Sequence, residues 1–346
     1  MIRASRLILL ATAALALNGP AGATDLEDIA RRFDHPDRYR VLFSRLIDRG
    51  VPLARVEAAF ASDKAGKRDH KAVELRTDIR HIPKHREAER KANERYLYQA
   101  KVLAENLREH RALYARMEKA YGIRREVIGA ILLKESALGR YDKFDHDAFV
   151  VFNSLYDGLS VPEDAGPRLR RRIPRLIRMA REQLIALVIY TYRRDLDLAQ
   201  TPFPASYAGA IGIPQWLPVH LEQAVSADGG TPDLTRLPDA ILSTAHLIRN
   251  KLGWPDAMLD FDRLANLDDI VAAWNEFDHG NASFAAGRNS DGQTMRRFDR
   301  AHAEMANVPY VATYVRALMH YNYSSDYALG VLRIARRAHR LLAADG

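Results

Sequence analysis

Apolar residues recur every three or four positions along most of this chain, which is the spacing of one face of an α-helix. No stretch shows the alternation of a half-buried strand, and no internal repeat is visible. The sequence therefore predicts a predominantly α-helical fold. Helices are expected over 25–63 with a break at 49–52, over 96–120, between Gly122 and Gly139, and over 239–252.

The N-terminal stretch departs from this helical pattern. Arg3 and Arg6 precede a short apolar run at 7–17, and small residues follow at 21–23. This arrangement is typical of a secretory signal peptide, and the run is shorter than the roughly 20 apolar residues that a spanning helix needs. We expect an exported, periplasmic protein whose mature chain begins near Thr24 and has no stable membrane anchor.

The stretch 64–95 also departs from the pattern, because it carries eleven Lys and Arg against six Asp and Glu with few apolar residues. Such a composition favours a solvated linker or an arm lying on the surface. The expected organisation is a signal peptide at 1–23, an N-terminal helical segment with a charged linker at 24–95, and a main domain at 96–346.

Composition narrows the possible partners and chemistry. The 346 residues include 52 Lys and Arg against 44 Asp and Glu and no Cys, and the isoelectric point is about 9.6. Disulfides, zinc–thiolate sites and thiol nucleophiles are therefore excluded, and polyanionic partners are favoured. The stretch 167–181 holds seven arginines and no acid. It predicts an amphipathic helix whose basic face is either simply solvated or faces a polyanion.

Glu135 stands out in the helix between Gly122 and Gly139. It follows Ile131 by four residues and precedes Leu138 by three, so it lies on the apolar stripe of that helix. Burial disfavours an ionised carboxyl and raises its pKa toward that of a useful general acid. The alternative is a glutamate at the edge of the stripe that reaches water or pairs with an arginine.

Two further stretches have candidate binding chemistry. The stretch 206–218 has small residues at Ala208, Gly209 and Gly212, which allow close approach of the backbone, and then Gln215 and Trp216. An amide beside a flat ring suits a sugar, although a tight turn with a core tryptophan fits equally well. The stretch 310–327 is rich in tyrosine, which is useful in a carbohydrate cleft and also common in helix packing.

Together these three stretches resemble the lytic transglycosylase superfamily, and most closely the membrane-bound lytic transglycosylase B group. The group's helix enters through Tyr-Gly and carries Glu-Thr/Ser followed by Gly-Arg. Its Ser-aromatic-Ala-Gly-Ala-Met-Gly stretch leads to Gln-Phe-Met-Pro, and a Tyr-Asn-x-Ser-x-x-Tyr-Ala stretch follows. The counterparts here are Tyr121-Gly122 with Glu135-Ser136 and Gly139-Arg140, 206–212 with 215–218, and 321–328.

The resemblance implies a lysozyme-like transglycosylase fold with an N-terminal helical extension. It further implies cleavage of the β-1,4 bond between N-acetylmuramic acid and N-acetylglucosamine in peptidoglycan glycan strands, leaving 1,6-anhydromuramoyl ends. Glu135 would be the single acid and base, and no metal or cofactor would be needed. The resemblance implies further roles in substrate binding for Ser206, Gln215, Trp216, Tyr321, Asn322 and Tyr327.

Other readings of the sequence stay open. A goose-lysozyme-like hydrolase would use Asp142, Asp145 or Asp147 as a second carboxylate. A non-catalytic wall-binding protein and a basic polyanion-binding protein are further alternatives, although nucleic acid is not expected for an exported chain. The loop at Asp228 keeps too few ligands for an EF-hand, which leaves calcium binding open. Binding of other cell-wall proteins is also open.

Overall fold

A computed structural model describes residues 26–78, 85–141, 144–281 and 290–344, so the signal-peptide prediction for 1–23 lies outside the described residues. The predicted helical fold is confirmed. The helices are α1 (Leu26–Ala30), α2 (Pro36–Asp48), α3 (Leu53–Ala61), α4 (Asp63–Gly66), α5 (His70–Thr77), α6 (His85–Tyr98), α7 (Ala100–Glu109), α8 (Arg111–Tyr121), α9 (Arg125–Ser136), α10 (Ala148–Gly158), α11 (Pro167–Arg193), α12 (Leu237–Lys251), α13 (Leu267–Asn281), α14 (Ser290–Ala301), α15 (Val308–Met319) and α16 (Ser325–Ala344), with short 3₁₀ turns η2 (Pro218–Gln223) and η3 (Asp262–Leu264).

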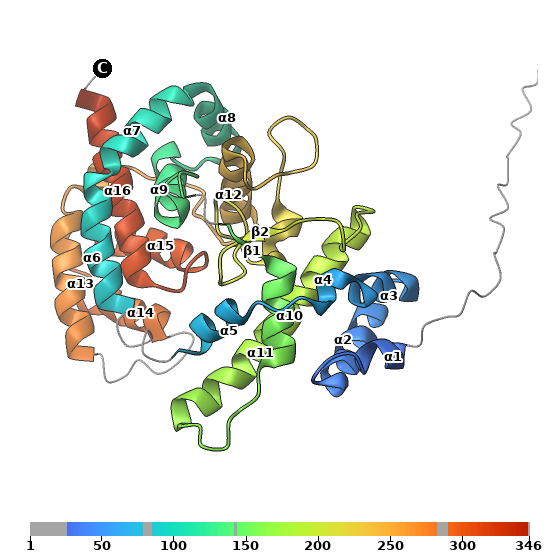
Figure 1. Ribbon diagram of the computed structural model, residues 1–346. Coiled ribbons are helices and arrows are strands. Elements are labelled where there is room, and N and C mark those ends of the chain that lie inside the picture. Colours follow the sequence, from blue (N-terminus) through green and yellow to red (C-terminus); the bar gives the residue numbers. More distant parts are fainter. Residues whose placement is uncertain (1–25, 79–84, 142–143, 282–289, 345–346) are drawn as a thin grey trace, which may run out of the picture.

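The helices pack around two hydrophobic cores (Figure 1). The first core surrounds α9 and is built from α7, α8 and α12–α16. The second core surrounds α10 and α11 and takes in α1–α5 and the segment before α12. Tyr321, in the turn between α15 and α16, packs against both cores. The junction between the cores therefore lies next to the tyrosine-rich stretch that the sequence singled out.

The stretch 64–95, expected to be a solvated linker or surface arm, is largely helical where it is described. It includes parts of α4 and α6 and the whole of α5. Helix α6 packs against α16, where the missing side chain of Gly330 leaves room for the buried side chain of Asn93. Composition misled here because the charged residues of α6 pair with partners far away in the sequence. Arg90, for example, reaches Asp326 and Asp278.

Helix α9 is buried around nearly its whole circumference rather than along one stripe. Gly122 ends the preceding helix in the left-handed conformation, with φ of 63°, as the sequence predicted. From Glu126 onward, every residue of α9 up to Leu133 is buried, because α7, α8, α12 and α16 all pack against this helix. A carboxyl near the C-terminal end of α9 is thus placed against protein on several sides.

Strand structure among the described residues is limited to β1 (His146–Asp147) and β2 (Pro204–Ala205), which pair antiparallel. The pairing joins the start of α10 to the small-residue stretch that begins at Ser206. None of the described helices is both long enough and apolar enough to span a bilayer.

Candidate active site

Glu135 lies at the last turn of α9 with its carboxyl directed to α16. Tyr327 donates a hydrogen bond from its hydroxyl to Oε1 of Glu135 at 2.6 Å. The tyrosine is 3% exposed, whereas Glu135 is half-buried and so keeps access to the surface. The helix ends immediately after this residue, with Ala137 in the left-handed conformation. The carboxyl is therefore held by a buried donor at a point where the chain turns away.

The surroundings of Glu135 favour its protonated form. Burial is the largest cause and raises the pKa of Glu135 to about 7, and the negative charge of Glu89 acts in the same direction. The hydrogen bond from Tyr327 and the positive charge of Lys134 act in the opposite direction and lower this pKa. A carboxyl that titrates near neutral pH can both give and take a proton, as a general acid and base must.

A buried cation, which the sequence reading did not single out, lies beside this carboxyl. The side chain of Lys134 is 3% exposed, and its Nζ lies 2.7 Å from Oε1 of Glu89 on α6. The same ammonium bonds Asn93 and lies over the rings of Tyr96 and Tyr327, 5.1 and 4.9 Å from their centroids. The available signal was a lysine inside the apolar run that leads to Glu135.

The small-residue stretch forms a tight loop braced by backbone contacts. Ser206 accepts a hydrogen bond from Gly209 N at 2.8 Å and donates its own N–H to Ala210. Gly209 has φ of 75°, and a Cβ there would lie 2.4 Å from the ring of Phe152 on α10. Gly212 has φ of 64° and faces the backbone of Leu234 just as closely. The predicted close approach of backbone is confirmed, and its partners belong to the second core.

Trp216 lies in the second core and is 2% exposed. Its Nε1 donates to the hydroxyl of Tyr321 at 3.2 Å, and that hydroxyl donates to the carbonyl of Pro214 at 2.6 Å. A ring buried to this extent has no face free for a pyranose. The sugar-stacking expectation for Trp216 is therefore corrected in favour of the packing alternative that the sequence left open.

The tyrosines connect this loop to the acid. The rings of Tyr321 and Tyr327 stack with centroids 6.5 Å apart and planes 16° from parallel. Contacts thus run from Trp216 through Tyr321 and Tyr327 to Glu135, and they bring residues from all three predicted stretches together.

The other three predicted binding residues are half-buried. Gln215 takes a left-handed φ of 52° and donates its side-chain amide to the carbonyl of Gly212 at 2.8 Å, so this amide also supports the loop. Asn322 follows Tyr321 in the turn before α16 and donates its backbone N–H to Leu318. Within the described part of the chain, no contact joins Ser206 or Asn322 directly to Glu135.

The aspartates considered as a second carboxylate differ in their surroundings. Asp142 lies outside the described residues. Asp147 caps α10 by accepting from the N–H groups of Phe149 and Val150, and its other oxygen accepts from Phe203 N and from Lys64 Nζ, both at 2.9 Å. Asp145 is exposed. The carboxylate of Asp147 is thus fully used in joining β1, α10 and the segment before β2.

The Asp228 loop was the sequence's candidate for calcium. The carboxylate of Asp228 is held by Ser226, Gly230 and Arg236. Among the described residues, no group of three or more His, Asp and Glu side chains is arranged to hold a metal ion.

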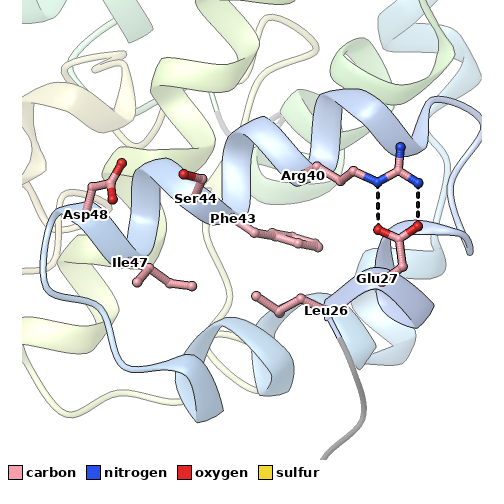
Figure 2. Close-up of a pocket in the computed structure, with 7 residues that line it drawn as sticks. All are labelled: Leu26, Glu27, Arg40, Phe43, Ser44, Ile47 and Asp48. Carbon is pink, nitrogen blue, oxygen red and sulfur yellow. Dashed lines mark hydrogen bonds and ion pairs between the residues drawn. The ribbon is translucent and has the colours of Figure 1, made fainter.

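A cavity is lined by α1 and α2, which belong to the second core (Figure 2). It measures about 380 Å³. Leu26, Phe43 and Ile47 form its apolar part, and Arg40 pairs with Glu27 at its edge. None of the residues that line this cavity has the surroundings of Glu135. We therefore place the candidate active site at Glu135.

Comparisons with known proteins identify the family of this chain. Residues 40–336 match the protein family described as "Transglycosylase SLT domain". A search of curated proteins gives no match.

Solved structures with a similar fold include the Escherichia coli lytic transglycosylase Slt35 in complex with bulgecin A. It is 16% identical with a TM-score of 0.56, over 89% of this chain and 94% of that one. The catenated lytic transglycosylase SltB1 from Pseudomonas aeruginosa is 17% identical with a TM-score of 0.57, over 88% and 97%. SltB3 from the same organism, in complex with NAG-anhNAM-pentapeptide, is 19% identical with a TM-score of 0.51, over 86% and 78%.

Proposed function

This chain belongs to the transglycosylase SLT domain family, whose members are enzymes that act on peptidoglycan, and from that premise we propose that it is a periplasmic lytic transglycosylase with Glu135 as its single acid and base. The proposed substrate is a glycan strand of peptidoglycan, cut between N-acetylmuramic acid and N-acetylglucosamine. The proposed product carries a 1,6-anhydromuramoyl end.

The observation that carries this proposal is the environment of Glu135. The protonated carboxyl donates its proton to the glycosidic oxygen as the bond from that oxygen to C1 of the muramoyl residue breaks. The C6 hydroxyl of the same residue then attacks C1 and returns its proton to Glu135. One group performs both steps, which requires a pKa near the working pH, and burial raises the pKa of Glu135 to about 7.

The surrounding residues have supporting roles in this proposal. Tyr327 orients the carboxyl through Oε1, and Tyr321 holds the loop of Gln215 and Trp216 against the junction of the two cores. Ser206 and Asn322 are half-buried and are proposed to contact the glycan directly. The substrate's own acetamido and hydroxyl groups complete the reaction, so that a second carboxylate is not required.

Digestion of purified sacculi in water enriched with ¹⁸O tests the reaction type. We expect muropeptides with anhydro ends, lighter by one water than hydrolysis products and free of ¹⁸O at the new end. Asp145→Asn serves as the control, because it removes an exposed candidate for the second carboxylate. Incorporation of ¹⁸O at the cut, together with loss of activity in this variant, would replace the proposal with hydrolysis.

Export is tested separately. The N-terminus of the protein recovered from the periplasmic fraction should lie near Thr24. Recovery of full-length protein from washed membranes would contradict the proposed location.

A further inference from the structure

We propose that Lys134 is a positioning residue for the candidate acid, held in place by α6. The proposal rests on the role of Glu135 proposed above, and it adds a residue that touches no substrate. Three contacts carry it: the ion pair from Lys134 Nζ to Glu89 at 2.7 Å, the bond to Asn93, and the position of the ammonium 4.9 Å from the ring centroid of Tyr327.

These contacts leave Lys134 little freedom. Its side chain is 3% exposed, so its charge is shielded from water and must be met by Glu89 and the aromatic faces around it. The ring that it faces belongs to the residue that donates to Glu135. A displacement of the ammonium would therefore move the Tyr327 hydroxyl and, with it, the carboxyl.

The lysine also acts on Glu135 through charge. The charged and titratable groups around the carboxyl are Tyr327 from α16, Lys134 from α9, Glu89 and Tyr96 from α6, and Tyr321 from the turn before α16. Among them, Lys134 and the Tyr327 hydrogen bond lower the pKa of Glu135, and Glu89 raises it. Lys134 and Glu89 therefore set the proton affinity of the acid in opposite directions.

A pair of substitutions tests this arrangement through the pH dependence of turnover. Lys134→Met removes the positive charge, so the alkaline limb of activity should move to higher pH. Glu89→Gln removes the negative charge, so the same limb should move to lower pH. The matched control is Glu94→Gln, an exposed carboxyl on the same helix that pairs with Arg333, and it should leave the limb in place.

Two readouts keep the test independent of folding and of the reaction type. Circular dichroism and thermal melting identify variants that do not fold. Titration of the ¹³C-labelled Glu135 carboxyl by NMR reports its pKa without turnover, so failure of the proposed function and failure of this inference are distinguishable. Shifts in opposite directions support the inference. Shifts in the same direction, or folded variants with unshifted pKa, would overturn it.

A second inference rests on a different surface, the first half of α11. Arg168, Arg171, Arg175 and Arg178 are spaced by three, four and three residues, which places them on one face of the helix. All four are exposed, and within the described part of the chain none has an acidic side chain within ion-pair distance. We call these four residues the arginine row. It extends about 15 Å along the helix at 1.5 Å per residue.

The surroundings of the arginine row add further positive charge. Glu182, four residues beyond Arg178, pairs with Arg45 of α2, with Arg49 just after α2, and with Arg181. The other nearby acids are Glu163 and Asp164, in the exposed segment before α11. Arg175 and Arg178 line a cavity of about 400 Å³ together with Met179, Gln183 and this same Glu182. In Figure 1 this half of α11 extends away from the rest of the molecule.

We infer that the arginine row docks on a bilayer that carries anionic phospholipid. An exposed row of guanidinium groups about 15 Å long fits a dense array of phosphates better than a single anion, and each guanidinium can bond a phosphate through two donors. The apolar face of α11 is buried in the second core, so the contact is electrostatic and reversible rather than inserted.

Co-sedimentation with phosphatidylglycerol vesicles tests this docking. Substitution of the four arginines of the row by Gln should weaken binding by about 100-fold at low salt, and high salt should release the native protein. The control replaces four exposed cations elsewhere, Lys101, Arg111, Lys119 and Arg337, by Gln and should bind nearly as well. Equal losses in both variants, or a loss confined to binding of purified sacculi, would overturn the inference.

Discussion

Glu135 and Asp326 are two carboxyls beside the first core, and adjacent residues of α6 act on them: Glu89 on Glu135 and Arg90 on Asp326. Their environments nevertheless differ. Asp326 is 3% exposed and accepts from Arg90 at 3.2 Å and from the indole of Trp274 at 3.1 Å. Glu135 accepts from the Tyr327 hydroxyl, and the nearest cation, Lys134, is paired with Glu89 instead. Burial is the largest cause of a raised pKa in both carboxyls.

Burial alone does not decide whether a carboxyl can exchange a proton during a reaction. A carboxyl that accepts from a guanidinium and an indole, as Asp326 does, is held by two fixed donors and serves to join elements. A carboxyl that meets a hydroxyl and keeps partial access to the surface can change its protonation state during a reaction. Burial raises the pKa, but the identity of the contacting donor determines how the carboxyl is used.

The largest expected effect is on turnover. Glu135→Gln should lower activity on sacculi by about 10²–10⁴-fold, since it removes the general acid. Asp326→Asn should keep activity in the folded fraction and instead cost about 1–3 kcal/mol of stability, because the half-buried Arg90 loses one of its two charged partners and keeps Asp278. Muropeptide release and thermal melting of both variants check this. Turnover within a few-fold of native in Glu135→Gln would remove the contrast between the two carboxyls.

We expect the stability of Glu135→Gln, relative to the native protein, to depend on pH. Because the folded pKa of Glu135 is raised to about 7, the native state holds this proton more tightly than the unfolded chain. Its contribution to stability is complete below the unfolded pKa of about 4.3 and is lost as the pH rises through 7. Glu135→Gln should therefore melt higher than native protein at pH 8, with a smaller difference at pH 5. An equal difference in melting temperature between variant and native protein at pH 5 and pH 8 would contradict the raised pKa of Glu135.

Substitutions of Trp216 test whether its ring packs in the second core or contacts a sugar. Trp216→Ala should cost about 3–5 kcal/mol, because it empties a large buried volume, and Trp216→Phe should cost less. Thermal melting, read beside turnover in the folded fraction, checks the order of the three proteins. An alanine variant with native melting and lost turnover would restore the sugar-stacking role.

The smallest expected effect comes from the hydroxyl that distinguishes Glu135 from Asp326. Tyr327→Phe removes the hydrogen bond that lowers the pKa of Glu135, so the alkaline limb of activity should move up by about one pH unit. Maximal turnover should fall roughly tenfold, since the carboxyl loses its orienting donor. A pH–rate profile measures both quantities. An unmoved limb would show that the hydroxyl does not act on the acid.

Local signals in the sequence predicted the helical fold and the helix that carries Glu135. Gly122 permits the left-handed end of α8, and the apolar spacing that follows requires no distant partner to be recognised. Gly209 and Gly212 likewise indicated a close backbone approach, because both conformations depend on the absence of Cβ at that position.

Tertiary packing decided which helices are buried all round and which charges pair, and local signals could not predict either. The spacing of apolar residues does not reveal how many neighbours cover a helix, so one stripe was expected where α9 is buried almost all round. The charges of 64–95 indicated solvent, yet Glu89 and Arg90 meet Lys134 and Asp326 at sequence separations of 45 and 236 residues. Trp216 suited either a sugar or a core, and only the position of Tyr321 against both cores places it inside. Sequence predicted the helices and the candidate acid, whereas charge pairing and burial depend on contacts between distant residues that only the folded chain brings together.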